Sequence, residues 1–293
     1  MPGLTLSGGE WDAGVLPEQG GRLTRLTFRG VEVLRSMTEG TSDPLDSACF
    51  PLVPYCNRIA DGAFAWLGDE VQLPHNFPPE TSSIHGLGWQ SAWEVVSSRD
   101  FNCAMEHRHP GLGQRPWEGA IDDWPWACHA EQRVRLGERG CAITLNLTNL
   151  SNVPMPAGLG FHPYFRRRPE TQVTFKSNGV WLVDDAQIPT GEIAASDHFG
   201  DFASGAPLPA QTIDHCYMLW DGVARIEDDL GTITLTARGA PYLHLYAPED
   251  GSALCLEPVS HMPDAHNQDP GDLTSLPPGC SASLQMWITA AAR

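Results

Sequence analysis

The sequence has almost no lysine and little positive charge. Its 293 residues include one lysine, Lys176, and 18 Lys and Arg residues stand against 36 Asp and Glu residues, which gives a formal net charge of −18. A surface this acidic repels the phosphates of nucleic acids and anionic lipid headgroups. We therefore expect no nucleic-acid or membrane partner, and a substrate that is neutral rather than polyanionic.

Metal-site cysteine spacings and long apolar runs are also missing. The eight cysteines include no Cys-x-x-Cys pair, and several lie in apolar, strand-like runs where a reduced thiol acts as a small hydrophobic group. The start, MPGLTLSGGEW, lacks a basic segment followed by an apolar one, and no apolar run reaches the roughly 18 residues of a membrane-spanning helix. These absences predict a reduced, soluble, cytoplasmic protein.

Helical periodicity is missing as well, and alternation with period two takes its place. No segment shows three turns of apolar residues at helical spacing with caps at both ends. In CAITLNLTN, by contrast, Ile143, Leu145 and Leu147 face one way and the polar residues between them face the other. This is the pattern of a half-buried strand, and TITLTARG (232–239) repeats it.

Short turn signals separate the predicted strands. FRGVE at 28–32, LGERG at 136–140 and DDLGT at 228–232 are typical of hairpin connections. Many strands, short hairpins and no alternation of strand and helix favour antiparallel sheets packed face to face. Since we find no repeat and no linker, we expect one all-β domain over residues 1–293, a large antiparallel β-sandwich with little helix.

Candidate functional residues lie in or beside three long loops. These loops, rich in Gly, Pro and Trp, are predicted at 54–93, 108–127 and 184–212, and loops of this length in a compact domain are often functional. The stretches of interest are PYCNRIADGAF (54–64), SIHGLGWQSAW (83–93), GLGFHPYF (158–165) and LCLEPVSHMPDAHN (254–267).

Two of these stretches place an ionisable residue directly before a proline. Strand alternation in ALCLEP puts Glu257 on one face with Ala253 and Cys255, so that the carboxylate has room beside it. The proline after Glu257, like the proline after His162, favours extended backbone at the residue before it. A single Glu-Pro or His-Pro is most often a surface turn, but together they predict two ionisable residues at strand ends that face one cleft.

Taken together, the four stretches resemble the aldose 1-epimerase (galactose mutarotase) family. The motifs occur in the family's order, as NRIADGAF, a His-Gly pair at 85–86, HPYF at 162–165 and EPVSHMPDAHN at 257–267, and they span residues 57–267. The resemblance implies a galactose mutarotase-like supersandwich that binds a monosaccharide in an open cleft. It also implies an isomerase that needs no cofactor and no metal.

The resemblance also implies roles for individual residues. In that family the strand-end glutamate is the general base and the histidine of the HPYF stretch is the general acid, which corresponds to Glu257 and His162. The Asn-Arg pair, the His-Gly histidine and an aspartate upstream of an aromatic residue bind sugar hydroxyls. Their counterparts here are Asn57, Arg58, His85 and, in TIDHCYM, Asp214.

The chain departs from the family at one contact. The glutamine-type or aromatic contact between the aspartate and the glutamate has no clear counterpart, and YLHLYAP offers His244 and Tyr246 as candidates. Trp89 and Trp93 are candidates for an apolar platform under a sugar ring, with core packing at least as good an explanation for either. The identity of the sugar and the oligomeric state, monomer or homodimer, stay open.

The chemistry of anomer interconversion needs one acid and one base. The base removes the proton of the C1 hydroxyl while the acid protonates the ring oxygen from the opposite side of the C1–O5 unit, and reclosure returns both protons. No metal or nucleotide is needed. With ordinary pKa values of about 4.3 for Glu and about 6.5 for His, the carboxylate and imidazolium pair is expected between these values, and the rate profile is expected to be bell-shaped.

Three alternatives accompany this hypothesis. His107 and His109 in EHRHP form a His-x-His pair suited to a metal, but a third ligand is missing and a solvated loop is preferred. A non-catalytic carbohydrate-binding protein accounts for the arginine, histidines and tryptophans, but not for an acid and a base together. RRRP at 166–169 suits phosphate and suggests an epimerase for a phosphorylated hexose, although a solvated turn is preferred.

Overall fold

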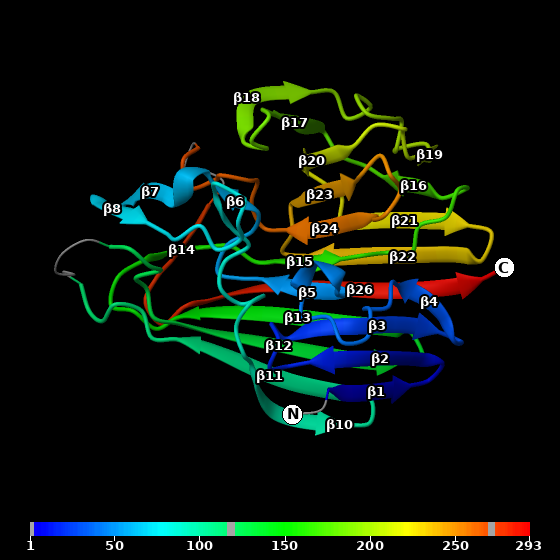
Figure 1. The fold of residues 1–293 in the computed structure, drawn as a ribbon, viewed down its shortest axis with the longest axis horizontal. Helices are drawn as coiled ribbons and strands as arrows, with labels where there is room; N and C mark the ends of the chain where they lie inside the picture. The colour runs from blue at the N-terminus through cyan, green and yellow to red at the C-terminus, as the bar shows by residue number, and fades with distance from the viewer. Residues whose placement is uncertain (1–2, 116–120, 269–272) are drawn as a thin grey trace.

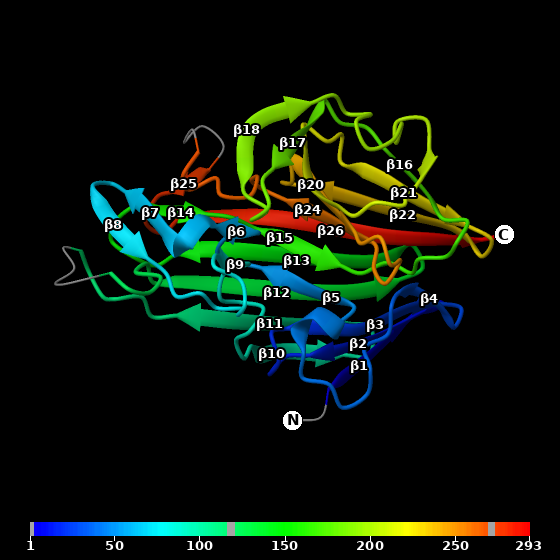
Figure 2. The same ribbon diagram turned by 45° about the horizontal axis from the view of Figure 1, so that its top comes forward.

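Two large antiparallel sheets form the body of the molecule. The computed structural model describes residues 3–115, 121–268 and 273–293. The first sheet has eleven strands in the order β1-β2-β3-β5-β15-β24-β23-β20-β17-β18, with β4 paired to β3, and the second has nine in the order β10-β11-β12-β13-β26-β22-β21-β16-β19. We call them the site sheet and the backing sheet. Figures 1 and 2 show them as two layers.

The site sheet consists of β1 (Leu4–Gly8), β2 (Trp11–Leu16), β3 (Arg22–Phe28), β4 (Val31–Leu34), β5 (Cys49–Leu52), β15 (Gly160–Pro163), β17 (Gly179–Val183), β18 (Pro189–Ala194), β20 (Ile213–Met218), β23 (Tyr242–Ala247) and β24 (Cys255–Val259). The backing sheet consists of β10 (Glu94–Arg99), β11 (Asn102–His109), β12 (Cys128–Gly137), β13 (Gly140–Asn149), β16 (Gln172–Phe175), β19 (Ala206–Pro207), β21 (Val223–Asp228), β22 (Gly231–Arg238) and β26 (Ser281–Ala292). Three two-stranded pairs join β6 (Arg58–Ile59) to β9 (Ser83–Ile84), β7 (Ala63–Trp66) to β8 (Asp69–Gln72) and β14 (Met155–Ala157) to β25 (Thr274–Leu276).

The alternating segments form strands as predicted. In β13, Ile143, Leu145 and Leu147 are buried and the polar residues between them are less so. Each predicted hairpin is present, because β3 pairs with β4, β12 with β13 and β21 with β22 across the expected turns. The all-β fold predicted from period two is therefore confirmed. Helix is limited, within the described residues, to two 3₁₀ turns at Pro44–Asp46 and Ala60–Gly62.

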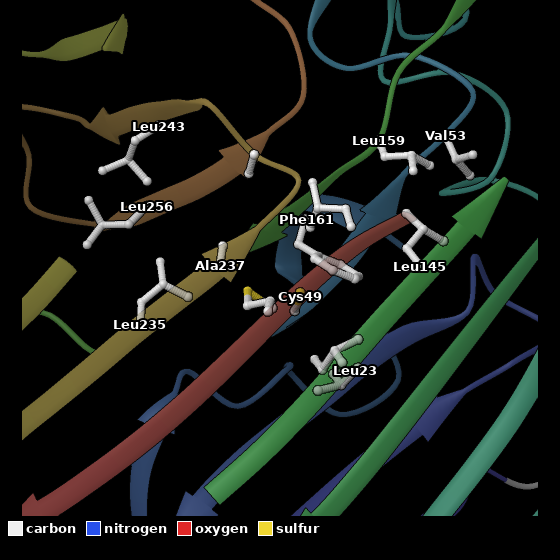
Figure 3. Close-up of a cluster of buried hydrophobic side chains, with 14 of the residues drawn as sticks. Leu23, Cys49, Val53, Leu145, Leu159, Phe161, Leu235, Ala237, Leu243 and Leu256 are labelled. Carbon is white, nitrogen blue, oxygen red and sulfur yellow. The ribbon is translucent and has the colours of Figure 1, made fainter. Parts of the chain in front are cut away.

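The main core fills the space between the two sheets. Leu23, Phe161 and Leu256 from the site sheet meet Leu145 and Leu235 from the backing sheet, and all five side chains are buried (Figure 3). Burial of such side chains contributes about 1.5–3 kcal/mol each relative to exposure. This packing fixes the site sheet, so that side chains on its opposite face hold defined positions.

The predicted long loops contain more structure than expected. Segment 54–93 holds β6, β7, β8, β9 and the second 3₁₀ turn, and segment 184–212 holds β18 and β19. Segment 108–127 begins inside β11, and its residues 116–120 lie outside the described residues. None of the eight cysteines, all within the described ranges, forms a disulfide, and seven are buried. No helix of the described chain is long and apolar enough to span a membrane.

Candidate active site

Four neighbouring strands of the site sheet supply the floor of a cleft. β15, β24, β23 and β20 follow one another in the sheet and carry His162, Glu257, His244 and Asp214, all of which line this cleft. His244 lies opposite Glu257 in the ladder between β23 and β24. The cleft has a volume of about 230 Å³. This is below the roughly 300–1,000 Å³ of drug-sized ligand sites, which suits a small ligand.

The predicted alternation around Glu257 is confirmed. Leu254 and Leu256 belong to the core between the sheets, whereas Ala253 and Cys255 belong to a second buried cluster with Phe50, Trp89 and Tyr164. Glu257 lies on the side of this second cluster and lines the cleft. The strand continues for two residues beyond it, to Val259, so Glu257 is near the strand end rather than at it.

A small ladder brings the Asn-Arg pair and the His-Gly pair together. β6 and β9 pair through Arg58 and Ile84. The backbone N–H of His85 donates to the carbonyl of Asn57 at 2.9 Å, and the N–H of Asn57 donates to Nδ1 of His85 at 3.2 Å. Because Nδ1 accepts this bond, the neutral ring of His85 carries its proton on Nε2. Both residues have positive φ, 54° for Asn57 and 62° for His85, a backbone region in which residues other than glycine are uncommon.

Arg58 is bound on several sides. Its Nε and Nη2 donate to the two carboxylate oxygens of Glu80, each at 3.2 Å. Its Nη1 lies 3.4 Å from Oδ1 of Asn57 and 3.7 Å from Oδ2 of Asp214. Glu80 also lines the cleft. The guanidinium therefore joins the wall of the cleft to its floor.

His162 and Glu257 are in contact and almost fully buried. Nε2 of His162 lies 3.3 Å from Oε1 of Glu257, and the two side chains are 7% and 2% exposed. The imidazole packs against Phe50 and Tyr164, each with a ring-centre distance of 4.6 Å, and meets His85 edge to face at 5.4 Å. These rings keep water from most of the imidazole.

Burial shifts the pKa values of the two residues in opposite directions. It lowers the pKa of His162 to about 3, with a further contribution from the nearby charge of His244. It raises the pKa of Glu257 well above the usual value, and the carboxylate of Asp214 adds to this effect. At pH values between the pKa of His162 and that of Glu257, the pair holds one proton, mainly on Glu257. The expected dominance of a carboxylate and an imidazolium between about pH 4.3 and 6.5 is therefore wrong for this geometry.

Asp214 and His244 form a second pair. Nε2 of His244 lies 2.6 Å from Oδ1 of Asp214. Although burial alone raises the pKa of Asp214, the hydrogen bond from His244 and the positive charges of His244 and Arg58 hold it below the usual value. Asp214 is thus a carboxylate, and Nε2–H of His244 donates to it.

Several polar atoms in the cleft lack a partner within the described chain. Nδ1 of His162, Nδ1 of His244 and Oε2 of Glu257 are buried and make no hydrogen bond. A buried polar group without a partner is rare and calls for an explanation such as a ligand. A small molecule with several hydroxyl groups can supply both the donors and the acceptors that these atoms need.

The family model of aldose 1-epimerases matches residues 9–289. The chain belongs to the aldose 1-epimerase family. It is 33% identical to the Escherichia coli protein YphB over 256 residues, which cover 83% of each chain.

Solved structures agree with this family. A candidate aldose 1-epimerase from Escherichia coli K12 matches with a TM-score of 0.89 and 29% identity, over 100% of this chain and 99% of that one. The GalM/aldose epimerase homologue from C. elegans matches with a TM-score of 0.83 and 20% identity, over 99% of each chain. The expected mutarotase-like sandwich is therefore confirmed as the fold.

All six predicted site residues line the cleft. They are Asn57, Arg58, His85, His162, Asp214 and Glu257. Of the further candidates, His244, Tyr246 and Trp89 also line it, whereas Trp93 lies in the main core. Trp89 is fully buried and stacks on Phe50, so it supports the wall. Sequence reasoning missed Glu80 and Phe77, which come from the segment between β8 and β9 and carry no recognisable motif.

The residues behind the metal-site and phosphorylated-hexose alternatives do not line the cleft. His107 and His109 are on strand β11 and not in the preferred solvated loop, and their rings contact the carbonyls of Ala92 and Trp124. The described residues hold no group of three or more His, Cys, Asp or Glu side chains that could bind a metal.

The arginines of RRRP do not line the cleft. Arg166 binds both carboxylate oxygens of Asp228, at 2.7 and 2.9 Å, Arg167 donates to the carbonyls of Pro248 and Ala253, and Arg168 pairs with Asp229. The run therefore offers no phosphate contact at this site.

Proposed function

We propose that this protein is a mutarotase, an aldose 1-epimerase that interconverts the α and β anomers of a monosaccharide by opening and reclosing the sugar ring. The observation that carries the proposal is the contact between His162 and Glu257 on the cleft floor. Pairs of titratable groups whose environments push their pKa values apart are typical of acid and base catalysts. Eight other polar side chains line the cleft around this pair, and such groups can bind hydroxyl groups.

Glu257 acts as the base and His162 as the acid. The carboxylate of Glu257 takes the proton of the C1 hydroxyl, the imidazolium of His162 gives its proton to the ring oxygen, and the C1–O5 bond breaks to give the aldehyde. Rotation about C1–C2 and reversal of both transfers closes the ring as the other anomer. No atom is gained or lost, and the pair returns to its first protonation state.

The two groups reach both oxygens from adjacent strands. We expected them on opposite sides of the C1–O5 unit, but β15 and β24 place them side by side. Both oxygens are bonded to C1, so groups 3.3 Å apart can contact them together. The same contact lets the proton held by Glu257 pass to Nε2 of His162, which forms the charged pair that the reaction uses.

Polarimetry tests the proposal. Freshly dissolved α-D-glucose and α-D-galactose are followed with wild-type protein and with Glu257→Gln, and we expect catalysed mutarotation of at least one sugar by wild type alone. Tight binding of these sugars by wild type without any acceleration would instead favour the alternative, a non-catalytic carbohydrate-binding protein.

A further inference from the structure

Glu80 holds the guanidinium of Arg58 in a two-pronged contact at the wall of the cleft. Both bonds are 3.2 Å long, and the side chains of Arg58 and Glu80 are 11% and 31% exposed. This is the fork-to-fork geometry in which arginine recognises a carboxylate. The place that a carboxylate or phosphate of a ligand would take on Arg58 is therefore occupied by Glu80.

The third nitrogen of Arg58 also faces oxygen atoms. Nη1 lies 3.4 Å from Oδ1 of Asn57 and 3.7 Å from Oδ2 of Asp214. Arg58 is the only Arg or Lys among the described residues that line the cleft. The positive charge of Arg58 is offset by the carboxylates of Glu80 and Asp214, so with Glu80 in place Arg58 gives the cleft no excess positive charge that would attract an anion.

The position of Glu80 is fixed by its own segment. The backbone N–H of Glu80 donates to the carbonyl of Phe77 at 3.0 Å. The side chain of Asn76 binds the N–H and the carbonyl of Ile84 at 2.8 and 2.7 Å and the carbonyl of Gly86 at 3.2 Å. The segment is thereby joined to β9 and to the residue after His85. Glu80 is therefore part of the cleft wall.

We propose that Glu80 determines the charge of the sugar that this cleft accepts. By occupying Arg58 and adding a negative charge, it selects neutral aldoses and rejects sugars that carry a carboxylate or a phosphate. Like charges placed close together at a binding site lower the affinity, which discriminates between otherwise similar sugars that differ in charge. The inference rests on the proposed mutarotase function and adds the class of substrate and the residue that selects it.

The test compares wild type with Glu80→Gln on four sugars at about pH 6, where amines are protonated. D-Galactose is the neutral sugar, D-galacturonate and D-galactose 6-phosphate are anions, and D-galactosamine is a cation. We expect the kcat/KM of each anion, relative to galactose, to rise about tenfold or more in Glu80→Gln. The relative value for galactosamine should fall. Opposite changes for anion and cation identify charge as the cause, because a loosened wall would change all the sugars in the same direction.

Glu227→Gln on the backing sheet is the matched control. Glu227 is exposed on β21 and does not line the cleft, so the same loss of one negative charge there should leave all the ratios unchanged. Equal ratios in wild type and Glu80→Gln would overturn the inference, as would wild-type activity on anionic sugars equal to that on galactose.

Binding measurements separate this inference from the proposed function. If wild type accelerates none of the sugars, the mutarotase proposal fails. Calorimetric titration of galactose and galacturonate into wild type and Glu80→Gln then still measures the selection by charge. A preference for galactose that disappears in Glu80→Gln supports the role of Glu80, and an unchanged preference refutes it.

Discussion

Nε2 of His162 and Oε1 of Glu257 lie 3.3 Å apart on adjacent strands of the site sheet. This one contact links the fold to the proposed chemistry. The packing that buries both side chains also lowers the pKa of His162 and raises that of Glu257. The same burial that makes each charged form unfavourable makes it reactive toward a sugar, since a strong acid and a strong base are held in contact.

Glu257→Gln and His162→Asn should each lose about 10²–10⁴ in kcat, because each removes one positioned proton-transfer group. Burial already favours the neutral form of Glu257, so glutamine, which has nearly the same shape, should not lower the free energy of unfolding. Polarimetry gives kcat, and urea unfolding gives the free energy of unfolding. Unchanged mutarotation in either folded variant would refute the assignment.

The pH dependence of kcat/KM should follow the form of the pair that holds one proton. That form is present between the pKa of His162, lowered to about 3, and the raised pKa of Glu257. The rate should therefore be level from about pH 4 up to the region of the raised pKa of Glu257. It should fall only as the pH rises through the pKa of Glu257, when the pair loses its proton. An acid limb with its midpoint at about pH 4.3, the ordinary pKa of Glu, in place of about pH 3 would contradict the lowered pKa of His162.

Much of the fold was predictable because its determinants are local. Period two in segments such as 141–149, the turn chemistry and the prolines after His162 and Glu257 act within a few residues, and the strands and hairpins followed from them. The alternation in ALCLEP also predicted on which face of its strand Glu257 lies. Most of the polar residues that line the cleft could be predicted from the ordered motifs, because each motif is short and contiguous in the sequence.

The rest could not be predicted because it depends on contacts between distant segments. Glu80 is 22 residues from Arg58, and only the folded segment between β8 and β9 brings them together. The protonation of the pair was predicted from exposed reference groups. The burial that inverts it comes from Phe50 on the neighbouring strand β5, together with Tyr164, which is close to His162 in the sequence. The motifs identify which residues form the site, but the tertiary packing determines their pKa values and protonation.

His244 should position Asp214 for the sugar. A hydrogen bond to a charged group is worth about 1.5–3 kcal/mol, and the one from Nε2 of His244 to Asp214 is 2.6 Å long. We expect His244→Leu to raise KM about tenfold or more, with a smaller effect on kcat. His244→Gln keeps an N–H donor and should recover most of the affinity. Equal KM values for the leucine and glutamine variants would show that the hydrogen bond does not matter.

The protein should lose stability in mild acid because it buries neutral histidines. Burial lowers the pKa of His162 to about 3 and that of His261 to about 4, and it lowers those of His85 and His266 well below the usual value. In the unfolded chain each titrates near pH 6.5. Their contribution is therefore complete above about pH 6.5 and decreases as the pH falls, by up to about 1.4 kcal/mol per pH unit for each residue.

His261 offers the cleanest test of this acid sensitivity because it lies outside the cleft. Its Nε2 accepts the N–H of Cys56 at 3.0 Å, and its Nδ1 donates to the carbonyl of Met262 at 2.7 Å. Protonation of Nε2 would destroy the first bond. His261→Gln should be less stable than wild type at neutral pH, by about 1–3 kcal/mol. Between about pH 6.5 and 4 its stability should decrease by about 3 kcal/mol less than that of wild type. Urea unfolding at several pH values measures both effects, with the exposed His75→Gln as the matched control, and parallel pH curves for His261→Gln and wild type would contradict the prediction.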